Sequence, residues 1–207
     1  MIYDISPPIR PSLAVFPGDT PPSREVLLDM SRGDPITLST LRSTAHVGAH
    51  LDAPSHYGRD ADPIDLRRLE LFVGPAEVVR VDVPRGELVT PEAMPEELRA
   101  PRVLIATRTV PDRTVFNRDF AALAPHLIEW LDRRGVFLVG VDTPSVDPAD
   151  SRELASHRAV LERDMNILEG IDLDDVPEGV YELIALPLRL VGFDASPVRA
   201  VLRPLVG

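Results

Sequence analysis

The chain has 207 residues, which is enough for one domain with a buried core, and nothing in its length requires two domains. Its 22 basic and 33 acidic residues give a formal net charge of −11, which disfavours binding to nucleic-acid phosphates or to anionic lipid. The absence of cysteine excludes disulfides, thiolate metal ligands and thiol nucleophiles. The sequence therefore predicts one domain over residues 1–207, without a nucleic-acid partner, in which any metal site consists of His, Asp and Glu.

The N-terminus lacks a basic segment followed by an apolar run, and no segment reaches the roughly 18 apolar residues of a membrane span. The 22 prolines are scattered between apolar segments and are not concentrated in a linker. We therefore expect a folded cytoplasmic protein that makes no contact with a membrane.

Short apolar and β-branched runs predict strands, and two amphipathic segments predict helices. In chain order the predicted strands are Leu13–Phe16, Ile36–Thr44, Ala76–Val83, Val103–Arg108, Val136–Val141, Glu182–Leu190 and Val198–Leu202. The predicted helices are Leu123–Arg133, which ends before Gly135, and Ser151–Asp164, with Ser151 as the candidate N-cap. The order of helix, strand, polar loop 142–148 and helix is typical of an α/β unit, so the sequence predicts a strand-rich α/β fold with few helices.

Three of the five histidines lie in one segment of eleven residues, His46-Val-Gly-Ala-His50-Leu-Asp52-Ala-Pro-Ser-His56. The glycine and the proline in this segment argue against a helix, so we expect extended chain with a bend. In extended chain, residues separated by even numbers point to the same side. Imidazole nitrogens and a carboxylate oxygen suit zinc, manganese or iron. The segment therefore predicts a divalent metal site in preference to a purely structural histidine cluster.

Further ligands must come from elsewhere in the chain. His157, on a predicted helix, is the strongest remote histidine, and Glu169 is an acid within an apolar, strand-like run. His126 lies in the other predicted helix, where we expect it to be solvated. The sequence contains no Gly-x-Ser-x-Gly turn and no phosphate-binding glycine pattern, which weighs against a serine hydrolase and against nucleotide chemistry.

Several segments together resemble the cyclase-like metal-dependent hydrolases, and in particular the kynurenine formamidase (arylformamidase) branch of that family. These segments are Tyr3–Ser6, Phe16–Thr20, His46–His56, Gly140–Asp147, His157 with Ile167–Gly170, Ala185–Leu188 and Asp194–Val201. The histidine segment is typical of the whole family, and the last segments are typical of the formamidase branch. The resemblance extends over nearly the whole chain.

The resemblance implies a compact swivelling β/β/α domain that forms a homodimer. It also implies two divalent metal ions per subunit, zinc with manganese as the alternative. By position, His46, His50 and Asp52 would bind one ion, and Asp52 would bridge to a second ion held by His157 and Glu169.

The resemblance assigns His56 as the acid/base residue and Phe16 to the position that lines the substrate pocket. Phe16 stands where the family usually has tryptophan, and it offers a smaller aromatic face without an N–H donor. Ala49 stands where the family usually has threonine, which removes a hydroxyl that could orient a ligand. We expect these departures to affect substrate preference and rate more than the type of reaction.

The expected reaction is hydrolysis of N-formyl-L-kynurenine to L-kynurenine and formate in tryptophan catabolism. In this reaction metal-activated water attacks the formyl carbon and His56 protonates the departing aniline nitrogen. One alternative is a hydrolase of the same family that opens a cyclic amide such as isatin. The formamidase-like segment Asp194–Arg199 weighs against this alternative. The other is a catalytically silent metal-binding protein, which would have no need for an acid/base histidine.

Overall fold

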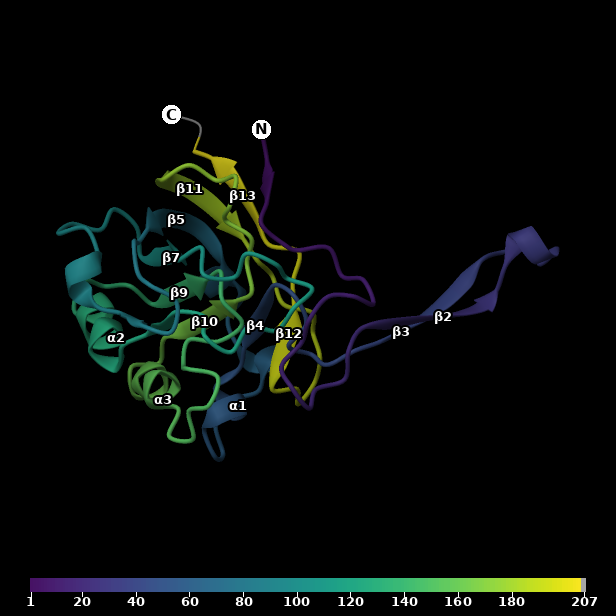
Figure 1. The fold of residues 1–207 in the computed structure, drawn as a ribbon, viewed down its shortest axis with the longest axis horizontal. Helices are drawn as coiled ribbons and strands as arrows, with labels where there is room; N and C mark the ends of the chain where they lie inside the picture. The colour runs from purple at the N-terminus through teal and green to yellow at the C-terminus, as the bar shows by residue number, and fades with distance from the viewer. Residues whose placement is uncertain (206–207) are drawn as a thin grey trace.

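A mixed β-sheet forms the body of the protein in a computed structural model, which describes residues 1–205 (Figure 1). Over that range the sheet has nine strands in the order β1-β13-β11-β5-β7-β9-β10-β4-β12. They are β1 (Tyr3–Asp4), β4 (His50–Asp52), β5 (Val73–Arg80), β7 (Arg102–Ala106), β9 (Leu138–Val141), β10 (Asn166–Glu169), β11 (Gly179–Ile184), β12 (Ala195–Pro197) and β13 (Val201–Pro204). The central strands β5, β7, β9 and β10 are parallel, and the outer strands pair antiparallel.

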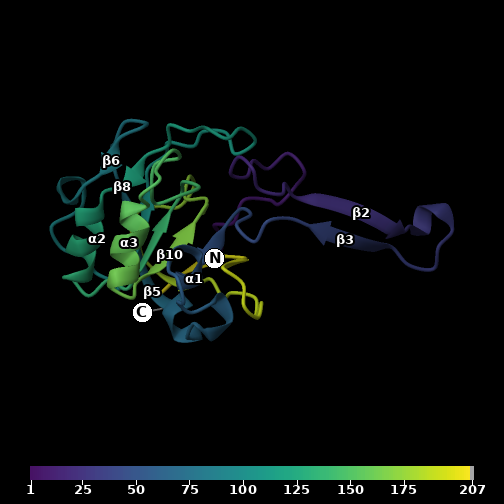
Figure 2. The ribbon, with the colours of Figure 1, turned by 90° about the horizontal axis from the view of Figure 1, so that it is seen from below.

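Two helices, α2 (Pro125–Asp132) and α3 (Ala155–Glu162), cover one face of the sheet (Figure 2). Alternate residues of a strand point to opposite faces, so Val103 and Ile105 of β7 pack beneath these helices while Leu104 joins a second core on the other face. The shorter elements are α1 (Pro54–Tyr57), η1 (Met30–Arg32), η2 (Ile64–Leu66), η3 (Leu69–Phe72), η4 (Pro91–Ala93), β6 (Leu88–Val89) and β8 (Ala122–Leu123). None of the helices among residues 1–205 has the length and hydrophobicity of a membrane span.

A separate antiparallel hairpin, β2 (Ser23–Leu28) and β3 (Leu38–Arg42), projects from the body in both views (Figures 1 and 2). We call residues 23–42 the arm. Its apolar side chains are exposed: Leu27, Met30 and Leu41 have exposed fractions of 50%, 64% and 67%. Several exposed apolar side chains on one projecting hairpin are typical of a surface that packs against another chain.

The predicted strand-rich α/β fold is confirmed, and most predicted strands occur with shifted ends. The prediction of a strand at Leu13–Phe16 is wrong: this segment is irregular, and besides the turn hydrogen bonds at its two ends it has one backbone hydrogen bond, from Ala14 N to Arg113 O (2.9 Å). A turn at Gly18, whose φ is +105°, follows directly, so no ladder forms. The predicted strand Glu182–Leu190 is wrong beyond Ile184, where β11 ends, because Pro187 has no N–H to donate to a ladder.

The segment from His46 to His56 is less extended than predicted. Its strand, β4, ends at Asp52, and α1 begins two residues later at Pro54. Proline is favoured in the first turn of a helix, where its missing N–H has no partner to lose. His56 therefore lies on a helical turn, and the prediction of extended chain up to that residue is wrong.

The predicted helix at Ser151–Asp164 starts four residues later, at Ala155 of α3. The prediction that Ser151 caps it is also wrong, because the Ser151 hydroxyl accepts a hydrogen bond only from Leu154 N (3.1 Å). The first turn is capped from the preceding loop: the Asp147 carboxylate accepts the backbone N–H groups of Ser156 and His157, at 3.0 Å each. A carboxylate at this position also complements the positive end of the helix dipole.

Candidate metal centre

Pairing between β4 and β10 places His50, Asp52 and Glu169 together. His50 lies opposite Glu169 in the register, and Asp52, two residues further along β4, points to the same face. His50 Nε2 is 3.5 Å from Asp52 Oδ1 and 3.4 Å from Glu169 Oε2. All three side chains are buried, and their candidate ligand atoms lie within 4.8 Å of one another. Two strands thus supply the floor of the site.

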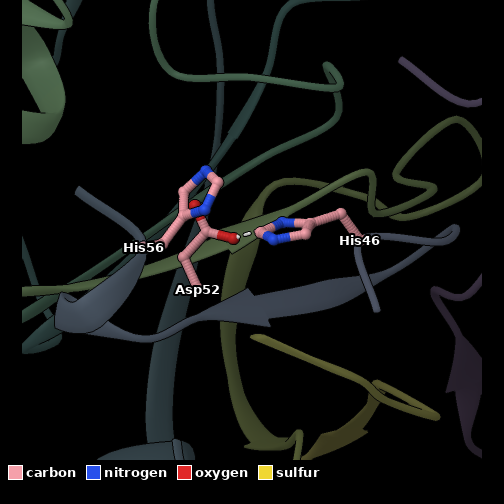
Figure 3. Close-up of side chains that lie close together, drawn as sticks. All are labelled: His46, Asp52 and His56. Carbon is pink, nitrogen blue, oxygen red and sulfur yellow. Dashed lines mark ion pairs between the residues drawn. The ribbon is translucent and has the colours of Figure 1, made fainter. Parts of the chain in front are cut away.

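Three more histidines approach this floor from outside the sheet. His46 comes from the loop before β4 and His56 from α1, and Figure 3 shows both rings directed towards Asp52. His46 Nδ1 is 2.9 Å from Asp52 Oδ1, and one ligand atom each of His46, Asp52 and His56 also lies within 4.8 Å of the others. His157 Nε2, from α3, is 3.5 Å from Asp52 Oδ2 and 3.9 Å from Glu169 Oε1. The Asp52 carboxylate therefore lies at the centre of the cluster.

Hydrogen bonds at the far nitrogen of each ring orient the ring and determine which nitrogen keeps its proton when the ring is neutral. His50 Nδ1 lies 2.9 Å from the carbonyl oxygen of Gly48, which can only accept, so Nδ1 is protonated and Nε2 presents its lone pair to the site. His157 Nδ1 is 2.6 Å from Asp147 Oδ2, and His46 Nε2 is 3.0 Å from Asp194 Oδ2. In each ring the remaining nitrogen faces Asp52 or Glu169. Metal-binding histidines typically have this arrangement.

Three buried polar atoms at the centre have no hydrogen-bond partner within the described part of the chain: His50 Nε2 and both carboxylate oxygens of Asp52. His46 Nδ1 is close to Asp52 Oδ1 but lacks hydrogen-bond geometry. Unpartnered buried polar atoms are rare because they lose solvation without compensation. A cation among them would satisfy all of these lone pairs, and imidazole nitrogens with carboxylate oxygens suit zinc, manganese or iron. The residues present therefore fit the divalent metal ions expected from the sequence.

The protonation of these groups follows from burial and from their neighbours. Burial by itself would lower the pKa values of His46 and His157, but the surrounding carboxylates outweigh it and raise them to about 9 and about 10. Burial would raise the pKa of Asp52, but His157 and His46 hold it well below its usual value. For His56, burial prevails and lowers its pKa below 6.5. Near neutral pH His56 is thus an uncharged base, whereas His46 and His157 must release protons to bind a cation.

A cavity of about 420 Å³ opens above the cluster, and His46, His50 and Glu169 are among the residues that line it. Phe16 forms part of its wall and packs edge-to-face against Phe116, with ring centroids 4.8 Å apart. A volume of this size suits a small organic ligand, and the two rings provide an apolar surface for an aromatic one.

The structure brings together His46, His50, Asp52, His56, His157 and Glu169, and it places Phe16 in the adjoining wall. His126 lies on the exposed side of α2, as predicted. Sequence reasoning missed Asp147 as the partner of His157, Asp194 as the partner of His46, and Phe116. The polar composition of loop 142–148 could have indicated Asp147. No local pattern indicates which loop folds onto Phe16.

Comparisons with known proteins place the chain in a family. The family model described as "Putative cyclase" matches residues 3–148, which is more than half of the chain. The chain belongs to the cyclase family. A protein from Bordetella petrii named kynurenine formamidase is 48% identical over 206 residues, covering 99% of this chain and 98% of the relative. This similarity groups the chain with the kynurenine formamidases.

Solved structures of other cyclase-like proteins share the fold. One, titled a potential metal-dependent hydrolase with cyclase activity, has a TM-score of 0.85 at 25% identity, covering 98% of this chain and 96% of the other. Isatin hydrolase A from Labrenzia aggregata has a TM-score of 0.80 at 23% identity, covering 98% of this chain and 93% of the other. The second similarity establishes the common fold alone.

Proposed function

We propose that this cyclase-family protein hydrolyses N-formyl-L-kynurenine to L-kynurenine and formate, a step of tryptophan catabolism. The observation that carries the proposal is the convergence of histidine and carboxylate ligand atoms, several of them unpartnered, below a cavity with an aromatic wall. Similarity over the full length to proteins named kynurenine formamidase supports the choice of substrate.

Two divalent metal ions per subunit, zinc with manganese as the alternative, form part of the proposal. His46, His50 and Asp52 would hold one ion, and Asp52, His157 and Glu169 the other. The division is supported by Asp52, whose Oδ1 faces His46 and His50 while its Oδ2 faces His157. Such ions, when bound, lower the pKa of coordinated water and polarise a substrate carbonyl.

We assign proton transfer to His56. It is the least buried of the clustered histidines, and its lowered pKa leaves it neutral near pH 7. As the water oxygen bonds to the formyl carbon, the free nitrogen of His56 takes a proton from that water. It then gives this proton to the aniline nitrogen as the C–N bond breaks. Formate leaves with the water oxygen, and L-kynurenine leaves as the free amine. Phe16 would stack on the aryl ring of the substrate.

The test measures kynurenine absorbance with metal-stripped protein before and after zinc or manganese is restored. Restored turnover is expected. His56→Ala should retain its metal and lose about 10²- to 10⁴-fold in rate, as for loss of a general acid/base. His126→Ala, a change of the exposed histidine on α2, is the matched control and should alter neither quantity. Loss of metal in His56→Ala would make this residue a ligand instead.

Two results would redirect the proposal. Turnover of isatin but not of N-formyl-L-kynurenine by metal-loaded protein would favour the cyclic amide hydrolase. Failure to bind any divalent metal would overturn the proposal as a whole.

We further propose that the protein is a homodimer in which the arm packs against a second copy. Support comes from the exposed apolar side chains of the arm, which its own chain leaves uncovered. Sedimentation should show a dimer for the full chain and a monomer for the double variant Leu27→Ser, Leu41→Ser. A dimer that survives these changes would place the interface elsewhere.

The assignment of residues 1–207 to one domain is also a proposal, supported by the pairing of β1 with β13 at the two ends of the chain. One cooperative unfolding transition is the expected result. Cytoplasmic location stays a prediction from the sequence, which fractionation of cells would test.

A further inference from the structure

We propose that Asp194 is a positioning residue that orients His56 for proton transfer and links it to the metal ligand His46. A single oxygen, Asp194 Oδ2, lies 3.0 Å from His46 Nε2 and 3.6 Å from His56 Nδ1. The two imidazole rings are themselves close, with centroids 4.3 Å apart. This inference rests on the proposed function, because it concerns how His56 carries out its part in that reaction.

The fold determines where this carboxylate lies. Asp194 directly precedes β12, whose pairing with β4 sets Ala195 opposite Asp52. The carbonyl oxygen of Asp194 accepts a hydrogen bond from Ala53 N (2.8 Å), at the residue before α1. The backbone of Asp194 is therefore attached both to the strand that carries Asp52 and to the start of the helical turn that carries His56.

Asp194 has no competitor for this position. Within residues 1–205 it is the only acidic residue with a carboxylate oxygen within 4.0 Å of a His56 nitrogen. A carboxylate beside Nδ1 favours the tautomer that has its proton there, so the lone pair of Nε2 is available to the reacting atoms. In substrate-free structures such contacts are often longer than a hydrogen bond and shorten when substrate binds.

The expected size of the effect is moderate. The Asp194 side chain is 51% exposed, so water screens its charge more than it would screen a buried carboxylate. We therefore expect Asp194→Asn to lower kcat by about 10- to 100-fold, below the roughly 10⁴-fold loss for a buried carboxylate that orients a catalytic histidine. Asparagine keeps the size of the side chain and removes the charge.

The first experiment is a double-mutant cycle on metal-loaded full-length protein at saturating zinc, with zinc content measured for each variant. If Asp194 acts through His56, Asp194→Asn should lower the rate in the wild-type background and cause no further loss in the His56→Ala background. If it acted only through His46 and the metal, the two losses would multiply, and that result would overturn the proposal.

The second experiment compares leaving groups. N-formyl-L-kynurenine and formanilide lose a poor leaving group that needs a proton, whereas 4-nitrophenyl formate loses one that does not. Asp194→Asn should slow the formanilides at least about tenfold more than the ester, since proton delivery contributes about 10²-fold or more. An equal loss on both kinds of substrate would also overturn the proposal.

Asp65→Asn is the matched control. Asp65 Oδ1 accepts a hydrogen bond from Gly192 N (2.8 Å), two residues before Asp194, and so supports the same loop without facing either histidine. It should show no selectivity between leaving groups. If it reproduces the Asp194→Asn pattern, the effect belongs to loop placement and the proposal fails. Wild-type protein that does not hydrolyse N-formyl-L-kynurenine would instead contradict the proposed function, so the two failures are distinguishable.

Discussion

Asp147→Asn should weaken both the fold and the metal site, because one carboxylate serves both. Asp147 Oδ1 accepts Ser156 N at 3.0 Å, and Oδ2 accepts His157 N at 3.0 Å and His157 Nδ1 at 2.6 Å. In the variant, the amide oxygen is best placed at the Oδ2 position, where it faces two donors. The amide nitrogen then takes the Oδ1 position and faces the N–H of Ser156, so a buried donor loses its acceptor.

The size of the change follows from these three contacts. An unpaired buried donor costs about 1 to 3 kcal/mol, and loss of the acceptor's charge weakens each of the other two hydrogen bonds by about 1 kcal/mol. Asp147 is also one partner of a buried ion pair with His157, and removal of one such partner costs about 3 to 5 kcal/mol. Because Asp52 and Glu169 still face the His157 ring, we expect about 3 kcal/mol, the lower end of the range. For a chain of this length that lowers Tm by about 6 to 12 °C. Loss of the carboxylate behind a ligating histidine should lower metal affinity by about 10- to 100-fold.

Thermal unfolding of metal-stripped protein measures the first effect, and competition for zinc with a chromophoric chelator measures the second. Asp150→Asn is the matched control, because Asp150 is an exposed acid in the same connection between β9 and α3, and it should change neither quantity. If Asp147→Asn leaves Tm and zinc affinity at their wild-type values, Asp147 neither caps α3 nor supports His157, and the reasoning is refuted.

Zinc binding at pH 7 should release about two protons, because carboxylates hold the pKa values of His46 and His157 near 9 and 10. Titration calorimetry in several buffers measures this release, and a heat of binding that does not depend on the buffer's ionisation enthalpy would contradict it. Both pKa values lie above the value of about 6.5 in the unfolded chain. The contribution of the two protonated histidines to the free energy of unfolding is therefore complete below pH 6.5 and is lost as the pH rises to 9–10. The Tm of metal-stripped protein should therefore fall between pH 7 and 10, and a constant Tm would argue against these protonation states. Phe116→Ala should raise KM about 5- to 10-fold with little change in kcat, as for loss of one aromatic contact; an unchanged KM would exclude Phe116 from the substrate pocket.

Local patterns in the sequence were sufficient to predict the class of fold and the centre of the site. The strands β7 and β9 were predicted within two residues at each end, because their buried apolar runs are continuous and interrupted only at turns. The segment from His46 to His56 carries four of the clustered side chains within one strand and its flanks, so their proximity depends mainly on local geometry.

Only the tertiary structure placed the remaining parts. Glu169 lies opposite His50 because β4 and β10 pair in one register, and segments more than a hundred residues apart in sequence find that register through packing of the sheet. Asp147 and Asp194 hold their histidines through loops whose paths no periodicity encodes. A side-chain pattern reports which face of an element is buried, but not which distant element covers it. The sequence therefore predicted which side chains form the candidate site, whereas the residues that orient those side chains are placed by long-range contacts.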